Sequence, residues 1–112
     1  MVEYTSMIDT LIALAEPNRL RIVELLRDGP RPVGEIGAQL RLRQPQTSKH
    51  LRVLKDAGLV VVRPDAQRRL YELRPQPLLE LDAWLEPYRQ YWSERLDALE
   101  TMLRTNNEHN KE

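Results

Sequence analysis

The sequence predicts a mainly α-helical fold with one small β-hairpin late in the chain. Apolar residues recur every three or four positions through most of its 112 residues, which is the spacing of amphipathic helices. The segment PQTSKHLRVLKDAGLVV, residues 45–61, has a proline where a helix can begin and a glycine where one can end. A charged segment ending in RRLYELR follows it and alternates like paired strands. The expected order is four helices, two strands and a fifth helix.

The first two helices are expected on either side of a corner at Pro17, where the chain must restart. One spans residues 5–15, with Thr5 or Ser6 as its cap. The other spans residues 18–27 and is mostly core. The apolar residues at helical spacing in these two helices are Ile8, Leu11, Ile12, Ala15, Leu20, Ile22, Val23, Leu25 and Leu26.

The third helix is expected over residues 32–40, and RLRQ forms the turn into the fourth. Gly34 and Gly37 leave little side-chain bulk on one side of the third helix, as close helix packing would allow. Its inward residues are Val33, Ile36 and Leu40. On the fourth helix the packing stripe is Thr47, Leu51 and Leu54, whereas Gln46, Lys49, Arg52 and Asp56 face elsewhere. The pair forms a helix-turn-helix whose second helix keeps one face free to touch a partner.

Two short strands and a long helix complete the chain. Residues 59–63 are β-branched and apolar, and residues 69–74 alternate, which predicts a hairpin with Arg68 and Arg69 near its tip. A helix is expected from Pro77 to about residue 105, and Pro87 should either kink it or divide it in two. Residues 1–105 then form a single domain, and residues 106–112 form a polar, disordered tail.

Charge is distributed unevenly along a chain whose net charge is zero. Residues 1–40 contain 4 Lys or Arg and 6 Asp or Glu. Residues 41–74 contain 9 basic and 3 acidic residues, and residues 75–112 contain 4 basic and 8 acidic residues. The local net charges are therefore −2, +6 and −4. The basic segment, residues 41–74, coincides with the fourth helix and the hairpin, so a polyanion such as DNA is the partner that it favours.

Composition and motifs exclude several classes of protein. The absence of cysteine excludes disulfides, thiolate metal sites and cysteine nucleophiles. The sequence has no Gly-rich phosphate loop, nucleophile elbow or paired acid and base, so we expect neither an enzyme nor a bound cofactor. No stretch reaches the length of a membrane span, and residues 1–15 lack the pattern of a signal peptide, so we expect a cytoplasmic protein without membrane partners.

Three segments together point to a known family. They are LIALAEPNRLRIVELL over residues 11–26, QPQTSKHLRVLKDAGLV over residues 44–60, and the hairpin with the terminal helix. The most specific pattern is Ser48, His50-Leu51, Val53-Leu54 and Ala57-Gly58-Leu59. Over nearly its whole length the chain resembles the ArsR/SmtB family of bacterial winged helix-turn-helix repressors. The resemblance implies a winged helix-turn-helix fold, dimeric assembly and DNA binding.

Two departures from that family matter. Its metal sensors carry cysteines in the helix that corresponds to residues 32–40, or His and Asp ligands on the last helix, and neither set is present. The histidines are His50 and His109, and the remaining carboxylates of the last helix, Glu86, Asp97 and Glu100, are better explained as charges on an exposed face. We therefore expect no metal site. The hairpin turn, DAQRR, also lacks the glycine often found there.

The residues placed toward DNA lie on the fourth helix and the hairpin. Amide and hydroxyl groups can read base edges, whereas Lys and Arg bind phosphate or guanine. The set is Gln44, Gln46, Thr47, Ser48, Lys49, His50, Arg52, Arg68 and Arg69. Within it, Thr47 is expected mainly to pack, and His50 either braces the structure through a hydrogen bond or contacts a phosphate. The alternative for the exposed members is an ordinary solvated surface.

The terminal helix carries more apolar and aromatic surface than a lone domain of this size can cover. Two-fold pairing through the terminal and first helices would cover it. The residues expected at the dimer interface are Leu11, Leu81, Trp84, Leu85, Tyr88, Trp92, Leu96, Leu99 and Leu103. A ligand pocket is the alternative interpretation of Trp84, Tyr88, Tyr91 and Trp92.

These observations predict a sequence-specific DNA-binding transcriptional regulator. The expected form is a homodimeric repressor of ArsR type that binds an inverted-repeat operator in double-stranded DNA. The alternative is a winged-helix interaction module whose basic face binds an acidic partner protein. The sequence leaves four alternatives for the inducing signal. It is a small-molecule effector bound near the aromatic helix, an oxygen-ligated ion or a partner protein, or there is no inducing signal.

Overall fold

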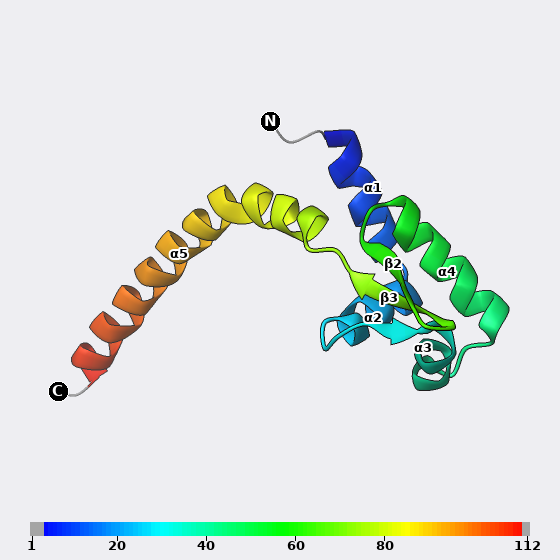
Figure 1. Ribbon diagram of the computed structural model, residues 1–112. Helices are drawn as coiled ribbons and strands as arrows, with labels where there is room; N and C mark the ends of the chain where they lie inside the picture. Colours follow the sequence, from blue (N-terminus) through cyan, green and yellow to red (C-terminus); the bar gives the residue numbers. More distant parts are fainter. Residues whose placement is uncertain (1–3, 111–112) are drawn as a thin grey trace. The chain divides into compact units, whose positions relative to one another are not determined.

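The computed structural model describes the backbone of residues 4–110 (Figure 1). In this range the elements are α1 (Tyr4–Leu14), α2 (Pro17–Leu26), β1 (Arg31–Pro32), α3 (Val33–Leu40), α4 (Gln44–Asp56), β2 (Val60–Asp65), β3 (Arg68–Leu73) and α5 (Gln76–Asn110). This mainly helical architecture with a hairpin confirms the predicted winged helix-turn-helix. The chain divides into two compact units between Glu80 and Leu81.

The sheet contains one strand more than the two that the sequence predicted. The strand order is β1-β3-β2, with β1 paired antiparallel to the central strand through Arg31 opposite Tyr71 and Pro32 opposite Leu70. A two-residue strand that includes a proline has no alternation of its own, so only its pairing partner defines it. The predicted third helix therefore starts one residue later, at Val33.

The core of the first unit is built from α2, α3, α4 and the start of β2, with α1 packed against it. Its buried apolar residues are Met7, Ala13, Ile22, Val23, Leu26, Ile36, Leu40, Leu51, Leu54, Leu59 and Val60. Leu20, one of the apolar residues of the helix that was predicted to be mostly core, is 44% exposed. It lies on α2, where Ile22, Val23 and Leu26 already supply the buried face.

Helix α1 exists as predicted, but the apolar residues that indicated it lie on its exposed side. Met7, Thr10 and Ala13 are buried, whereas Ile8, Leu11 and Ile12 are 48%, 41% and 61% exposed, and Ala15 is exposed as well. Both stripes have helical spacing, and the buried Thr10 satisfies its hydroxyl by donating to the Ser6 carbonyl at 3.1 Å. Thr5 and Ser6 lie inside α1, so neither is its cap. Periodicity thus identified the helix but not the side that packs.

The helix-turn-helix depends on one close approach between α3 and α4. A Cβ added to Gly37 would lie 3.0 Å from Thr47 Oγ1 and 3.1 Å from the Leu42 carbonyl oxygen, so a larger residue would push the helices apart. Gly34 has nothing within 4 Å of such a Cβ, so the close-packing prediction is wrong for that position. Helix α4 has Pro45 in its first turn, and Gly58 follows it with a φ of 78°, as predicted.

The hairpin closes with the two-residue turn Ala66-Gln67 between the paired residues Asp65 and Arg68. Ala66 takes the left-handed φ of 55° that glycine would adopt more readily. Pro64 is accommodated because β2 is an edge strand of the sheet. The missing glycine therefore does not prevent a tight wing.

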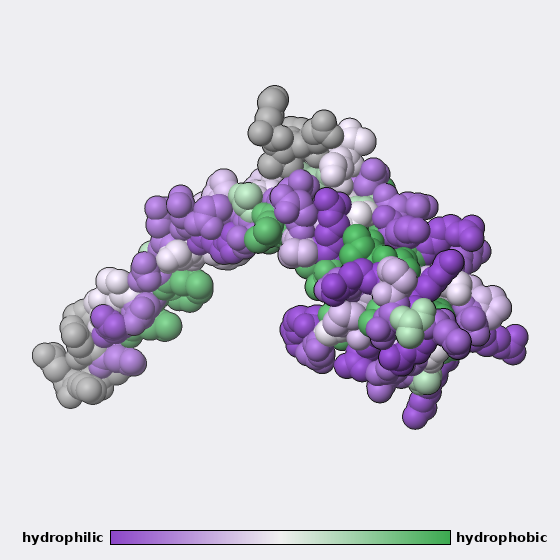
Figure 2. Space-filling model, viewed as in Figure 1, coloured by the Kyte–Doolittle hydropathy of each residue, from purple (hydrophilic) through white to green (hydrophobic). Residues whose placement is uncertain are grey.

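The second unit is helical from Leu81 through Asn110. Helix α5 continues through Pro87, so the proline does not divide it, and residues 106–110 are helical where a disordered tail was predicted. Residues 111–112 lie outside the described part. Exposed apolar side chains run along the helix (Figure 2). They include Trp84, Leu85, Tyr88, Tyr91, Trp92, Leu96, Leu99, Met102 and Leu103. Among the described residues, no helix has the length and apolar character needed to cross a membrane.

Candidate nucleic-acid interface

Helix α4 exposes a polar and basic surface that begins in its first turn. Because Thr47, Leu51 and Leu54 are buried, the helix is fixed with its opposite side toward solvent. The predicted residues that the structure brings together on this exposed side are Gln44, Gln46, Ser48, Lys49 and Arg52. Gln46 also accepts a hydrogen bond from the Arg43 backbone N–H at 3.3 Å, which helps to begin the helix. These five residues are called the α4 face.

Thr47 does not belong to the α4 face, although it was included among the DNA-facing residues. Its side chain is fully buried, and its hydroxyl donates to the Arg43 carbonyl at 3.0 Å. The same oxygen is the atom that a side chain at Gly37 would meet. Thr47 therefore fixes the angle between α3 and α4, as its packing role required.

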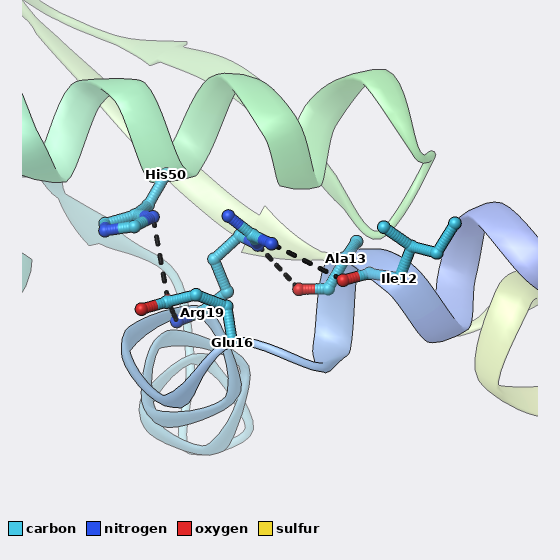
Figure 3. Close-up of polar contacts among 5 residues, drawn as sticks. All are labelled: Ile12, Ala13, Glu16, Arg19 and His50. Atoms are coloured by element: carbon cyan, nitrogen blue, oxygen red, sulfur yellow. Dashed lines mark hydrogen bonds and ion pairs between the residues drawn. The ribbon is translucent and has the colours of Figure 1, made fainter.

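His50 lies on the flank of α4 and faces the corner between α1 and α2 (Figure 3). Its Nδ1 is 3.7 Å from Glu16 Oε2, and that same carboxylate oxygen accepts the Arg19 backbone N–H at 2.9 Å at the start of α2. Arg19 in turn donates from Nε to the Ala13 carbonyl at 2.7 Å and from Nη2 to the Ile12 carbonyl at 3.4 Å. The distance is too long for the predicted hydrogen bond, but the orientation of His50 toward Glu16 supports bracing rather than contact with a phosphate.

The wing presents its two predicted arginines differently. Neighbouring residues of a strand point to opposite faces of the sheet, so Arg68 and Arg69 lie on opposite faces of the hairpin. Arg68 Nη2 is 3.3 Å from Asp65 Oδ2 across the turn, and Arg69 is exposed on the face that it shares with Tyr71. The nearby Arg63 is also paired, with its Nη2 2.7 Å from Glu72 Oε1. Arg69 is therefore the more available cation of the pair.

A hollow of about 350 Å³ lies between α4 and β3, and we call it the α4–β3 hollow. Its lining consists of Ser48, Leu51, Arg52, Lys55, Asp56 and Tyr71. Lys55 and Tyr71 were not among the predicted site residues. Lys55 follows Ser48 and Arg52 at helical spacing, which the sequence could have indicated, but the proximity of Tyr71 depends on how the sheet packs against α4.

Comparison with known proteins identifies the class of molecule that carries this surface. Residues 14–63 match the family model described as a helix-turn-helix domain. Over 84 residues the chain is 43% identical to the HTH-type transcriptional regulator Rv2034 of Mycobacterium tuberculosis, an overlap of 75% of this chain and 76% of that protein. The HTH-type transcriptional repressor SmtB of the same species is 38% identical over 65% of this chain and 54% of its own length.

A solved structure extends the likeness to three dimensions. It is the homodimeric winged helix-turn-helix DNA-binding domain Mb0332 from Mycobacterium bovis, described as a possible ArsR-family transcriptional regulator. The TM-score is 0.64 at 28% identity, covering 78% of this chain and 81% of that one. The chain belongs to the ArsR/SmtB family of helix-turn-helix transcriptional regulators. Membership of a family of regulators confirms the prediction that it is not an enzyme.

Among ArsR/SmtB proteins, this chain differs from the metal sensors in the groups that could hold a metal ion. In the described part, no three His, Cys, Asp or Glu side chains gather into a metal-binding group. Glu86 pairs with Arg89 at 3.1 Å, and Glu100 pairs with Arg104, so these carboxylates already have cationic partners. Asp82, mainly through its hydrogen bond, raises the pKa of the Arg89 guanidinium. The side chain of His109 lies outside the described residues.

Proposed function

We propose that this ArsR/SmtB regulator is a homodimeric repressor that binds an inverted-repeat operator with the α4 face. The observation that carries the proposal is the exposure of amide, hydroxyl and cationic side chains on one side of α4, beside a basic wing. The family supplies the context, and one relative is named a repressor. Repression would follow if the operator overlaps a promoter and the bound protein blocks polymerase.

Base recognition is assigned to the first half of α4. The N-terminal residues of a recognition helix reach deepest into the major groove. Gln44, Gln46 and Ser48 can each exchange hydrogen bonds with base edges there. Lys49 and Arg52 supply the cations of the same face, and Arg69 supplies one from the wing. His50 is assigned a bracing role because its Nδ1 lies toward Glu16.

Dimerisation is assigned to two apolar surfaces. One is exposed by α1 in the first unit, and the other is exposed by α5 in the second unit. Leu11 on α1 and Trp92, Leu96 and Leu99 on α5 are between 41% and 61% exposed, which is costly to leave wet. A second copy of the chain covers such surfaces symmetrically. The proposed interface set is Leu11, Leu81, Trp84, Leu85, Tyr88, Trp92, Leu96, Leu99 and Leu103. The Mb0332 domain is homodimeric, which supports this assignment.

A two-fold dimer predicts the form of its DNA site. Two recognition helices related by a dyad enter successive major grooves, so half-sites should lie roughly 34 to 36 Å apart in an inverted repeat. A repressor of this kind acts where bacterial promoters are, which places it in the cytoplasm.

Selection of bound sequences from random duplexes tests the proposal, followed by transcription in vitro from a promoter that overlaps the selected site. We expect a palindromic consensus, salt-dependent binding that discriminates against a scrambled duplex, and reduced transcript with added protein. Recovery of asymmetric or single half-sites would contradict the dimer geometry, and increased transcript would contradict repression. Binding without sequence preference would favour the alternative, a module for acidic protein partners.

A further inference from the structure

We propose that the α4–β3 hollow is a seat for one phosphate of the DNA backbone, in which Lys55 and Tyr71 position the recognition helix. The inference rests on the proposed DNA-binding function and adds a ligand group and two residues to it. The hollow lies on the side of α4 that faces the wing, and Leu51 and Tyr71 connect its lining to the buried core.

Apart from the Asp56 carboxylate, the polar groups of the hollow are suited to a phosphate. Ser48, Arg52 and Lys55 follow one another at positions i, i+4 and i+7, so their side chains lie along one flank of α4. Arg52, Lys55 and the Tyr71 phenol provide a guanidinium, an ammonium and a hydroxyl donor, while Ser48, which is assigned to base edges, only borders the hollow. Among the described residues, no side-chain hydrogen bond or ion pair involves Arg52, Lys55 or Tyr71. Hydrogen bonds from cationic donors to phosphate oxygens are among the stronger ones in proteins.

Charge favours a phosphodiester over a free phosphate ion. Arg52 and Lys55 carry two positive charges and Asp56 carries one negative charge, so the lining has a net charge of +1. A backbone phosphodiester carries a single negative charge and matches this lining. Inorganic phosphate is more highly charged near neutral pH, so the Asp56 carboxylate repels it more strongly than it repels a phosphodiester.

The position of Tyr71 allows a bound phosphate to connect the sheet to the recognition helix. Tyr71 is on the central strand β3, where it pairs with Arg31 on one side and Val62 on the other. A phosphate held between the Tyr71 hydroxyl and the α4 cations would join the sheet to the recognition helix through the DNA. Phosphate contacts of this kind set the register of a protein on the duplex without reading its sequence.

Methylphosphonate scanning of the selected duplex tests the seat directly. Each backbone phosphate is replaced in turn by a neutral methylphosphonate linkage, and the Kd is measured for wild type, Lys55→Gln and Tyr71→Phe. We expect one linkage in each half-site at which neutralisation weakens wild-type binding roughly tenfold and weakens both variants much less. Lys55→Gln should also flatten the slope of log affinity against log salt by about 0.9, and Tyr71→Phe should leave the slope unchanged because it removes no charge.

Arg21→Gln is the matched charge control, because Arg21 is an exposed cation on α2 outside the basic segment. It should keep the wild-type methylphosphonate profile, and thermal unfolding checks that every variant is folded. The seat is overturned if both Lys55→Gln and Tyr71→Phe keep the full wild-type sensitivity at every linkage. It is also overturned if inorganic phosphate, at constant ionic strength, binds wild type through Lys55 without displacing DNA, which would assign the hollow to a free anion. Failure of wild type to bind any duplex would instead refute the proposed function.

Discussion

Helices α4 and α5 both carry apolar residues every three or four positions, but α4 buries them within the first unit, whereas those of α5 from Trp84 onward are exposed in the second unit. Leu51 and Leu54 of α4 are fully buried, whereas Trp92 and Leu96 of α5 are each 61% exposed. The periodicity is the same because both helices have one side that packs. The difference shows where the packing partner lies: α2 and α3 supply it for α4, and we propose that a second copy of the chain supplies it for α5. The exposed polar side of α4 is then free for DNA.

The largest effect is expected from breaking the proposed α5 interface. Trp92→Glu places a charge in that surface and should yield monomers in light scattering. Its DNA affinity should fall by about 10²-fold or more, because the second half-site contact is no longer intramolecular. Gln90→Glu, an exposed polar position on the same helix, should remain dimeric. A wild-type chain that is monomeric at micromolar concentration would refute the interface.

Truncating one leucine on each helix separates internal packing from assembly. Leu54→Ala should lower the free energy of unfolding by about 2 to 5 kcal/mol in denaturant titration, since it leaves a cavity in the core. Leu96→Ala, on the exposed stripe, should instead shift the protein concentration at which dimers form. Equal losses of stability that do not depend on protein concentration would contradict the distinction between the two helices.

A smaller effect is expected on the wing. Arg69→Ala should weaken binding to specific and random duplexes alike and flatten the salt slope by about 0.9 per site. Arg68→Ala should change the slope less, because Asp65 already neutralises Arg68 across the turn. A salt titration of both variants decides the order. If neither substitution changes affinity or slope, the wing is a structural hairpin only.

The smallest effect is expected from transition metals. Zinc, nickel, cobalt and copper should leave operator affinity nearly unchanged in a chelator-free titration, because Glu86 and Glu100 are already paired with arginines. A shift of tenfold or more at near-stoichiometric metal would contradict this and direct attention to Glu86, Asp97, Glu100 and His109.

Local signals explain which parts of the structure could be predicted. The limits of α4 depend on Pro45 and Gly58, whose backbone preferences act at the residue itself, and its exposed side follows once Leu51 and Leu54 are buried. The buried side of α1 could not be predicted because its two stripes are equally periodic and only the docking surface selects one.

The contacts that the sequence did not reveal join residues far apart in the chain. They are the approach of Glu16 to His50, the pairing of β1 with β3, and the position of Tyr71 beside α4. Each depends on the packing of elements that are separated in sequence, so no local pattern encodes it. The exposure of the α4 residues that we propose to face DNA could be predicted because it depends on their own helix, whereas the hollow beside them required a strand.

The central claim is that the α4 face reads bases, and it is tested most directly by measuring the specificity of Gln46→Ala and Ser48→Ala. Affinity is measured on the selected duplex and on a scrambled duplex at the same salt concentration. We predict a loss of about 1 to 3 kcal/mol on the selected duplex and almost none on the scrambled one, because base-edge hydrogen bonds discriminate and phosphate contacts do not. Equal losses on both duplexes, or no loss on either, would contradict base reading by α4.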